Sequence, residues 1–194
     1  MTDTARVAAI IAEFAKAMQA MDATAHAAVA AMADAVIDCF KQGRQVLVCG
    51  NGGSAADAQH ISAELAGRFL LERRPLPCIS LTTNTSILTA IGNDFSFDEV
   101  YSRQVAGLGR KGDVLWGIST SGNSRNVLEA ARLARQMGLR VIGMTGPTGG
   151  KLLELCDVCF RAPAQRTDRI QQLHQVAYHL ICELVDEAFA ARKP

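Results

Sequence analysis

The stretch QVLVCGNGGS, residues 45–54, joins a short apolar run to a glycine-rich turn and a serine. The run Gln45–Cys49 is apolar almost throughout instead of alternating with polar residues, which is typical of a strand covered on both faces. A helical stretch, Ser54–Phe69, follows the glycines directly. This order of strand, turn and helix predicts one unit of a parallel α/β sheet.

The same order repeats along the rest of the chain. The further predicted strands are Cys78–Leu81, Val114–Ile118, Val141–Met144 and Val158–Arg161. The predicted helices between and after them are Ser86–Ile91, Asp98–Leu108, Ser124–Met137, a short one near Leu152, and Asp168–Ala190. We therefore expect a three-layer α/β/α sandwich with a parallel sheet of about five strands, formed by residues 43–194 of a single domain spanning 1–194.

The residues before this alternation predict two helices. Residues 5–42 are rich in alanine, lack proline and glycine, and carry apolar side chains at helical spacing. Thr24 could cap the second helix, and Gly43 ends it. The pattern predicts a helical hairpin with a narrow apolar stripe. That stripe could pack on a partner subunit or on its own domain, and the pattern alone leaves both open.

Composition excludes several classes of protein. The chain has 194 residues, with 20 Lys and Arg against 19 Asp and Glu, so its net charge of +1 does not suggest a nucleic-acid surface. No run approaches the roughly 20 apolar residues of a membrane helix. The N-terminal residues show no cationic leader followed by an apolar block. We expect a cytoplasmic protein with neither nucleic acid nor membrane as a partner.

The six cysteines indicate buried thiols in a reducing compartment, because most of them lie inside apolar runs. Cys156 and Cys159 have the CxxC spacing of redox and zinc pairs, but the chain has no second such pair. They also flank a predicted strand. A structural role is therefore favoured over a redox or zinc role for this pair.

The turn after the first strand, Cys49–Ser54, predicts a ligand-binding loop. Its glycines allow a ligand to approach the backbone, and Ser54 can cap the following helix, with Asp57 completing a pair like that of a capping box. In an open parallel sheet, ligands bind beyond the carboxyl ends of the strands, where this turn lies. Ligand contact is favoured over a simple connecting turn.

A second turn of the same kind, Ser119–Ser124, has the sequence STSGNS. Its hydroxyls and the backbone N–H groups at a helix N-terminus form a cradle for an anion. The turn contains neither lysine nor arginine, which suits a phosphate monoester that must be released. A serine-rich solvated turn is the alternative, and two such turns after neighbouring strands count against it.

Titratable side chains follow the first turn. His60 and Glu64 are four residues apart on a predicted helix, so they share a face, and Asp57 lies one turn earlier. An imidazole and a carboxylate at this spacing can bind a metal or perform acid–base chemistry. Spacing alone would favour an exposed polar stripe. The position of this helix directly behind a ligand loop favours a functional site.

The last predicted helix carries a second polar face. Asp168 and His179 fall within about 20° of each other at 100° per residue. Gln172 and Gln175 lie near that line and Gln171 lies further round, so helical geometry does not choose among the glutamines. His174 lies off the line and is interpreted as a packing or surface residue.

Taken together, these motifs resemble the sugar isomerase (SIS) domain family from about residue 40 to the C-terminus. The segments that carry the resemblance are CGNGGS (49–54), DAQH (57–60) with Glu64, GNDF (92–95), GDVLWGISTSGNS (112–124), and DRIQ (168–171) with His179. The branch that they resemble converts D-sedoheptulose 7-phosphate to D-glycero-D-manno-heptose 7-phosphate through an enediol. That reaction is the first step toward nucleotide-activated heptose for lipopolysaccharide core or other surface glycans.

The resemblance also implies an assembly, a metal and a set of site residues. Members of this branch are typically homotetramers with active sites between subunits and one zinc per subunit, so helices 1–42 are expected to pack subunits and 43–194 to bind the sugar phosphate. The implied metal ligands are His60, Glu64, Gln171 and His179. The implied substrate-binding residues are Asn51, Gly52, Gly53, Ser54, Glu64, Asn93, Asp94, Ser119, Thr120, Ser121, Ser124, Asp168 and Gln171.

An enediol isomerisation needs one group that moves the carbon proton and another that serves the oxygens. We assign Glu64 as the proton-transferring base and His179 as its acid–base partner. Ligation of a metal would occupy the same atoms, which leaves their division of labour open.

Two other functions are compatible with the fold. A regulator that associates with the replication initiator DnaA shares the fold and the tetramer, and segments 54–56, 58–60, 88–91 and 98–101 lean toward it. That branch lacks equivalents of Glu64 and His179, which this chain has. A sugar-phosphate-sensing module would keep the phosphate loop but need no acid–base pair. The isomerase is therefore the favoured reading.

Overall fold

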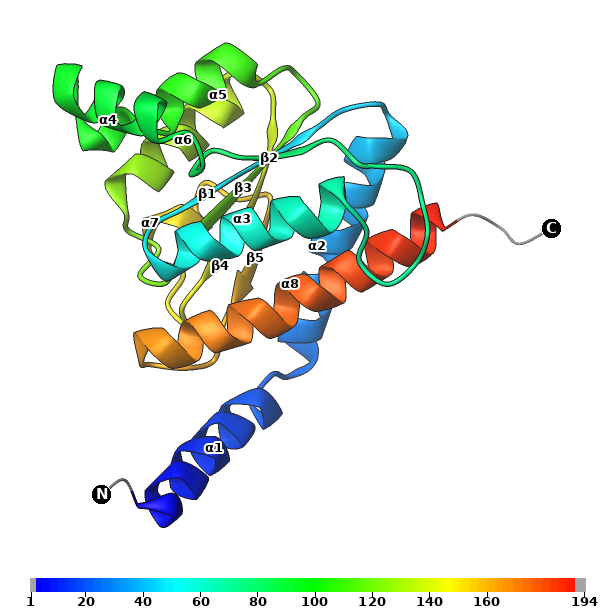
Figure 1. The fold of residues 1–194 in the computed structure, drawn as a ribbon, viewed down its shortest axis with the longest axis vertical. Helices are drawn as coiled ribbons and strands as arrows, with labels where there is room; N and C mark the ends of the chain where they lie inside the picture. Colours follow the sequence, from blue (N-terminus) through cyan, green and yellow to red (C-terminus); the bar gives the residue numbers. More distant parts are fainter. Residues whose placement is uncertain (1–2, 191–194) are drawn as a thin grey trace.

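The computed structural model describes residues 3–190 as one α/β body with a helix projecting from it (Figure 1). The strands are β1 (Val46–Gly50), β2 (Cys78–Ser80), β3 (Val114–Ser119), β4 (Arg140–Thr145) and β5 (Val158–Arg161). The helices are α1 (Thr4–Gln19), α2 (Ala23–Lys41), α3 (Gly53–Ala66), α4 (Thr85–Asp94), α5 (Ser102–Leu108), α6 (Arg125–Gln136), α7 (Gly150–Leu153) and α8 (Thr167–Phe189), with a short 3-10 helix η1 (Phe97–Glu99).

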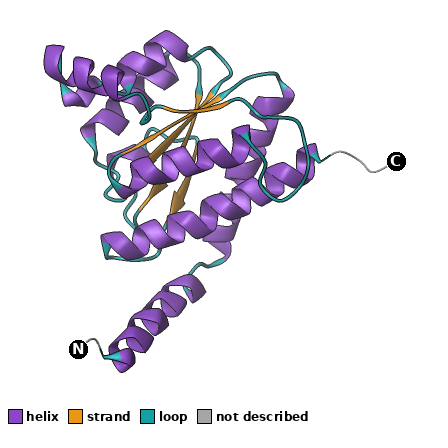
Figure 2. Ribbon diagram, in the orientation of Figure 1, coloured by secondary structure: helices purple, strands orange, loops and turns teal. Residues whose placement is uncertain are grey.

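The five strands form one sheet in the order β2-β1-β3-β4-β5, and every neighbouring pair is parallel. Helices cover both of its faces (Figure 2), which confirms the predicted three-layer sandwich. The strand order reverses between β1 and β3, whose ends pair as Gly50 with Ile118. Ligands bind outside the carboxyl ends of the strands at such a switch point. The two glycine- and serine-rich turns follow these two strands.

The strands are apolar throughout because each face of the sheet buries a separate core. Alternate side chains of a strand point to opposite faces. Trp116 of β3 is buried on the face covered by α2, α3 and α8, and Leu115 is buried on the face covered by α5, α6 and α7. Both side chains are fully buried. The sequence pattern of a strand covered on both faces is thereby explained.

The N-terminal helices do not form the predicted hairpin. Figure 1 shows α1 projecting below the body, continuing away from α2 instead of folding back along it. No residue of α1 is buried, whereas Met32, Val36 and Phe40 of α2 are completely buried in the core. The hairpin is wrong because the apolar stripe of α2 packs on its own sheet and α8, whereas α1 meets the body through Phe14 and Ala17 and through Arg169 of α8, which donates to the Ile10 carbonyl.

Two details of α2 also differ from the sequence-based expectations. Asp22, not Thr24, caps the helix: its carboxylate accepts a hydrogen bond from the Ala25 backbone N–H at 2.9 Å. Among the described residues, α2 is also long and apolar enough to cross a membrane by length and composition, although no such run was expected. Close to half of that window, 44%, is buried inside this fold, as in the core helix of a globular domain.

Candidate active site

Helices α3 and α8 lie side by side and run in the same direction (Figure 1). Their contacts advance together along both helices, at a constant separation of 118 residues in the chain. The residues that face each other are Gly53 and Gln171, Asp57 and Gln175, and His60 and Tyr178. This parallel pairing brings the polar face predicted on each helix against that of the other.

A cluster of three titratable side chains lies between these helices. The Nε2 atom of His60 is 2.9 Å from Oε1 of Glu64, and the ring of His179 lies 5.0 Å from that of His60. Each of the three residues offers one metal-ligating atom, and these atoms all lie within 4.8 Å of one another. The structure thus brings His179 to His60 and Glu64, from which it is more than 100 residues away in the sequence.

Tyr178 orients the ring of His60. An ionised Glu64 carboxylate only accepts hydrogen bonds, so the Nε2–H of His60 donates to it and the Tyr178 hydroxyl donates to Nδ1 at 2.9 Å. Burial raises the pKa of Tyr178, and the nearby Asp57 carboxylate raises it further, so the hydroxyl keeps its proton at neutral pH. The sequence analysis missed Tyr178, although it directly precedes His179 in the chain.

The surroundings keep His179 neutral and the cluster accessible. Burial lowers the pKa of His179, and the neighbouring His60 lowers it further. The ring of Phe69 stacks on it at 5.7 Å. The side chains of His60 and Glu64 remain 44% and 20% exposed, so the cluster is open to a ligand from solvent. Burial raises the pKa of Asp57, one turn away, to about 6.

The donor set of this cluster fits zinc. Two imidazole nitrogens and one carboxylate oxygen are the ligands of several catalytic zinc sites, which leave the fourth position open. Ligand atoms of a tetrahedral zinc lie about 3.4 Å apart at bond lengths of about 2.1 Å. The three donors, within 4.8 Å of one another, would have to close by small side-chain rotations. With a metal on Nε2, His60 would carry its proton on Nδ1 and donate it to the Tyr178 hydroxyl oxygen, which is the outer contact that commonly orients a histidine ligand.

The three glutamines of α8 point to different places. The amide of Gln171 packs on Gly53, where a Cβ atom would lie 2.5 Å from its Nε2. Gln172 instead accepts a hydrogen bond from Arg169 at 2.6 Å, and Gln175 lies beside Asp57. Gln171 therefore faces the first ligand loop, two turns along α8 from His179. Its place as a fourth metal ligand stays a prediction.

Helix α3 begins at Gly53, one residue earlier than expected. Gly52, with φ of 56°, is the N-cap residue. Because glycine has no side chain, α3 has no side-chain cap. Ser54 is buried inside the first turn, so its predicted role as the capping residue is wrong. Asn51 is held by two reciprocal hydrogen bonds of 2.8 Å with Asn126 of α6, a residue that the sequence analysis missed.

The second loop gathers its hydroxyls at the N-terminus of α6. The Oγ atom of Ser119 lies 2.9 Å from that of Ser124 and 3.5 Å from that of Ser121. Ser124 makes no side-chain cap, and Asn126 Oδ1 accepts from the Val127 N–H, so the amides of Arg125 and Asn126 are the ones that the helix N-terminus can offer to an anion. Gly122 has φ of 65°, and a Cβ there would collide with the Gly149 carbonyl oxygen, so only glycine fits.

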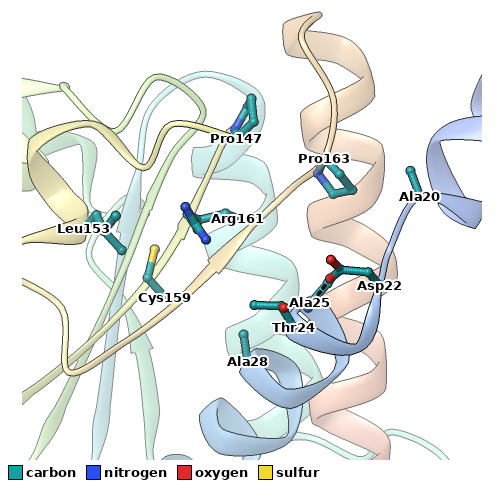
Figure 3. Close-up of a pocket in the computed structure, with 10 residues that line it drawn as sticks. All are labelled: Ala20, Asp22, Thr24, Ala25, Ala28, Pro147, Leu153, Cys159, Arg161 and Pro163. Carbon is teal, nitrogen blue, oxygen red and sulfur yellow. Dashed lines mark hydrogen bonds between the residues drawn. The ribbon is translucent and has the colours of Figure 1, made fainter.

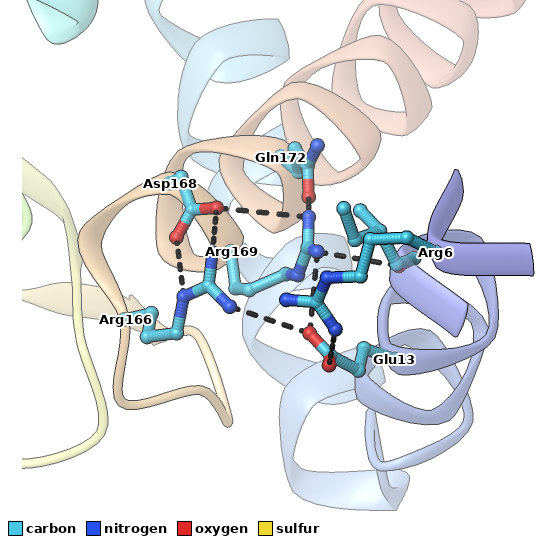
Figure 4. Close-up of polar contacts among 7 residues, drawn as sticks. Arg6, Glu13, Arg166, Asp168, Arg169 and Gln172 are labelled. Atoms are coloured by element: carbon cyan, nitrogen blue, oxygen red, sulfur yellow. Dashed lines mark hydrogen bonds and ion pairs between the residues drawn. The ribbon is translucent and has the colours of Figure 1, made fainter. Parts of the chain in front are cut away.

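Three predicted substrate residues lie apart from the cluster within this chain. Asn93 and Asp94 form a hydrogen bond with each other at the end of α4, well separated from α8 in Figure 1. Asp168 pairs with Arg166 at 2.8 Å, and Arg166 reaches Glu13 of α1 (Figure 4). Thr120, in contrast to these three, lies in the second loop, where its carbonyl oxygen accepts a hydrogen bond from the Gly146 backbone N–H at 2.9 Å.

His174 is a packing residue. Its side chain is completely buried, and its Nε2 lies 3.0 Å from the Thr145 carbonyl oxygen, to which it donates. Burial lowers its pKa to about 4, so it stays neutral at physiological pH. Of the two readings left open by the sequence, the structure selects packing over a surface position.

Comparison with known proteins identifies the family and supports the fold. The SIS domain family pattern matches residues 10–146. The phosphoheptose isomerase of Rhodospirillum rubrum is 56% identical over 164 residues, which cover 84% of this chain and 87% of that protein. The structure of phosphoheptose isomerase GmhA from Neisseria gonorrhoeae superposes with a TM-score of 0.90 at 45% identity, covering 96% of this chain and all of that one. A phosphoheptose isomerase from Francisella tularensis, 35% identical, gives a TM-score of 0.91 and also covers 96% of this chain and all of that one. The chain therefore belongs to the SIS domain family, with phosphoheptose isomerases as relatives along most of its length.

Proposed function

We propose that the protein is an aldose–ketose isomerase that converts D-sedoheptulose 7-phosphate to D-glycero-D-manno-heptose 7-phosphate. The observation that carries this function is the His60, Glu64 and His179 cluster on paired helices, directly behind two loops at the switch point of the sheet. The names of the relatives supply the substrate class. The reaction is the first step toward activated heptose for surface glycans, and we place it in the cytoplasm.

The chemistry requires no external reactant. Glu64 takes a proton from C1 of the ketose, a C1–C2 double bond forms, and the carbonyl oxygen at C2 gains a proton to give the enediol. The proton then returns to C2 while the hydroxyl at C1 loses its own and becomes the aldehyde. His179, kept neutral by burial, moves the proton between the two oxygens.

We further propose that His60, Glu64, Gln171 and His179 hold one zinc ion per subunit. Bound zinc would supply Lewis-acid polarisation of the substrate oxygens. Tyr178 fixes the ring of His60 for this role, and the second carboxylate oxygen of Glu64 remains free to accept the carbon proton. The stacked ring of Phe69 shields one face of His179 from water.

The phosphate is proposed to bind the second loop. Changing Ser121 and Ser124 together to alanine removes two hydroxyl donors beside Ser119. Each is worth about 0.5–1.5 kcal/mol, so KM is expected to rise about 5- to 150-fold. Steady-state kinetics measure this, with Ser102→Ala at the start of α5 as the matched control. An unchanged KM in the double variant would place the phosphate elsewhere.

The assignment itself is tested by incubating the protein with sedoheptulose 7-phosphate and following the heptose 7-phosphate product by NMR. Product formation supports the isomerase. If no product forms with zinc supplied, binding assays with DnaA and with sugar phosphates distinguish the two alternatives, a replication regulator and a sensing module. The identity of the relatives favours the isomerase over both.

We propose a homotetramer whose active sites lie between subunits. In support, the apolar side chains of Val7, Ile11 and Met18 on α1 are exposed to solvent in the single chain. The substrate residues Asn93 and Asp94 lie on α4, away from the cluster of the same chain, so a second subunit would be needed to supply them.

Removal of α1 tests this assembly. Deleting residues 1–20 is expected to lower the oligomeric state, because the exposed apolar side chains of α1 are lost while every buried residue of the core remains. The deletion stops before α2, since that helix belongs to the core and its loss would unfold the chain. Light scattering coupled to gel filtration measures the mass. A truncated chain that stays a tetramer would refute the role of α1.

A further inference from the structure

Two cysteines that the proposed active site does not use converge over one glycine of the sheet. Strand β4 pairs with β5 so that Gly143 lies directly opposite Cys159. A Cβ at Gly143 would collide with the Sγ atom of Cys156 and lie 3.4 Å from that of Cys159. Both sulfurs therefore fill the space that a side chain at residue 143 would take, and they do so from the two ends of a CxxC sequence.

One of the two sulfurs faces a cavity of about 500 Å³ (Figure 3). Cys159 and Arg161 point from β5 to the same side of the strand, toward Leu153 and Pro147. The Sγ atom of Cys159 also lies 3.6 Å from the hydroxyl of Thr145. The cavity has none of the proposed active-site residues in its lining, so this site is separate from the cluster on α3 and α8.

The environment makes the pair unlike the other cysteines. Cys156 and Cys159 are partly exposed, whereas Cys39, Cys49, Cys78 and Cys182 are buried. Burial raises the pKa of the Cys39, Cys49 and Cys182 thiols to about 12, which keeps them protonated. The interaction between the two sulfurs lowers the pKa of Cys159 and raises that of Cys156. A thiol of lowered pKa beside one of raised pKa is the arrangement of a nucleophile with its resolving partner.

We propose that Cys159 and Cys156 form a reversible redox pair, with Cys159 reacting first from the cavity and Cys156 resolving the product. A small disulfide such as glutathione disulfide supplies the oxidising equivalents. The Cys159 thiolate attacks one sulfur of that disulfide, forming a mixed disulfide and releasing one thiolate. Cys156, after losing its proton, attacks Sγ of Cys159, forming the internal disulfide and releasing the second thiol. The two cysteines are oxidised by two electrons, and one disulfide is reduced to two thiols.

The internal disulfide closes a ring of only a few residues. It joins the turn before β5 to β5 itself, so it does not bridge distant elements, and the sheet should keep its fold. In a reducing compartment such a bond is transient, as expected of a redox-responsive pair. The proposal does not rest on the isomerase function, because neither cysteine contacts the cluster on α3 and α8.

The test treats the full folded chain with glutathione disulfide, quenches free thiols by alkylation, and digests with trypsin. Cleavage after Lys151 and Arg161 releases Leu152–Arg161, LLELCDVCFR, which contains both cysteines of the pair and none of the others. We expect this peptide to lose two hydrogen atoms and to escape alkylation, and dithiothreitol to restore both thiols. The four buried cysteines, measured in the same digest, serve as internal controls and should remain thiols.

Two variants separate the roles within the pair. Cys156→Ser should stop the reaction at the mixed disulfide, so that Cys159 carries one glutathionyl group. Cys159→Ser should leave Cys156 as a free thiol. Circular dichroism before and after treatment checks that each chain stays folded. The proposal is overturned if Leu152–Arg161 keeps both thiols, if Cys159→Ser reacts as fast as Cys156→Ser, or if the buried cysteines are oxidised at the same rate.

Discussion

Replacing Glu64 with glutamine is expected to lower the turnover of sedoheptulose 7-phosphate about 10²–10⁴-fold, the usual contribution of a positioned acid–base group. The glutamine amide keeps the shape of the side chain. Its oxygen can still accept a hydrogen bond from His60, whose Nε2 lies 2.9 Å from Oε1 of Glu64 in the native chain. It cannot accept the carbon proton, so binding should persist while chemistry stops. Steady-state kinetics and substrate calorimetry separate these two effects.

His179→Ala should cause a similar loss of turnover and also lower the zinc content, because an imidazole donor disappears from the cluster. Metal analysis of the purified variant measures the second effect. Glu72→Gln is a suitable control for Glu64→Gln, because it makes the same chemical change at an exposed residue outside the cluster. His174→Ala is a poor control despite its place on the same helix, because that side chain is completely buried. Native turnover in the Glu64 and His179 variants would refute the mechanism.

Asp186→Ala is expected to destabilise the fold by about 3–5 kcal/mol, the range for breaking a buried ion pair. Asp186 and Arg73 are both completely buried as side chains, with Nε 2.5 Å from Oδ1. The second carboxylate oxygen accepts from the backbone N–H groups of Leu70 and Leu71 at 2.7 and 2.8 Å. Alanine would leave the two backbone N–H groups without this acceptor and the buried guanidinium without a counter-charge, because the other partners of Arg73 are neutral carbonyl oxygens.

The same pair supports the candidate active site. Arg73 donates to the Glu64 carbonyl oxygen at 2.7 Å, and so holds the end of α3 that carries the proposed base. The segment that Asp186 binds follows Phe69, whose ring stacks on His179. The Asp186 variant should therefore also lose activity at temperatures where it is still folded.

Urea unfolding followed by circular dichroism measures the loss of stability. Glu129→Ala breaks an exposed pair with Arg132 on α6 and should cost at most about 1 kcal/mol. Replacing both members of the buried pair, as Arg73→Met with Asp186→Leu, should restore part of the loss, because no uncompensated charge is then buried. If Asp186→Ala costs no more than Glu129→Ala, the buried Arg73–Asp186 pair does not stabilise the fold as proposed.

Much of the architecture follows from local sequence patterns. Continuous apolar runs such as that of β1 indicate strands covered on both faces. The structure agrees, because each face of the sheet buries its own hydrophobic core. The i,i+4 relation of His60 and Glu64 is also local, since helix geometry alone puts them on one face. The position of both ligand loops follows from their places after two strands of a parallel sheet.

Contacts between distant segments were decided only by the tertiary structure. Periodicity could not choose among the glutamines of α8, because the choice depends on which of them faces Gly53 across the α3–α8 pair. The Tyr178 contact with His60 spans 118 residues, and the Arg73–Asp186 pair spans 113. The direction of α1 was likewise beyond the sequence, since an apolar stripe shows that a helix has a face to bury but not what buries it. A residue pattern determines the local geometry of its own segment, whereas packing depends on surfaces that only the folded chain, or its assembly, brings together.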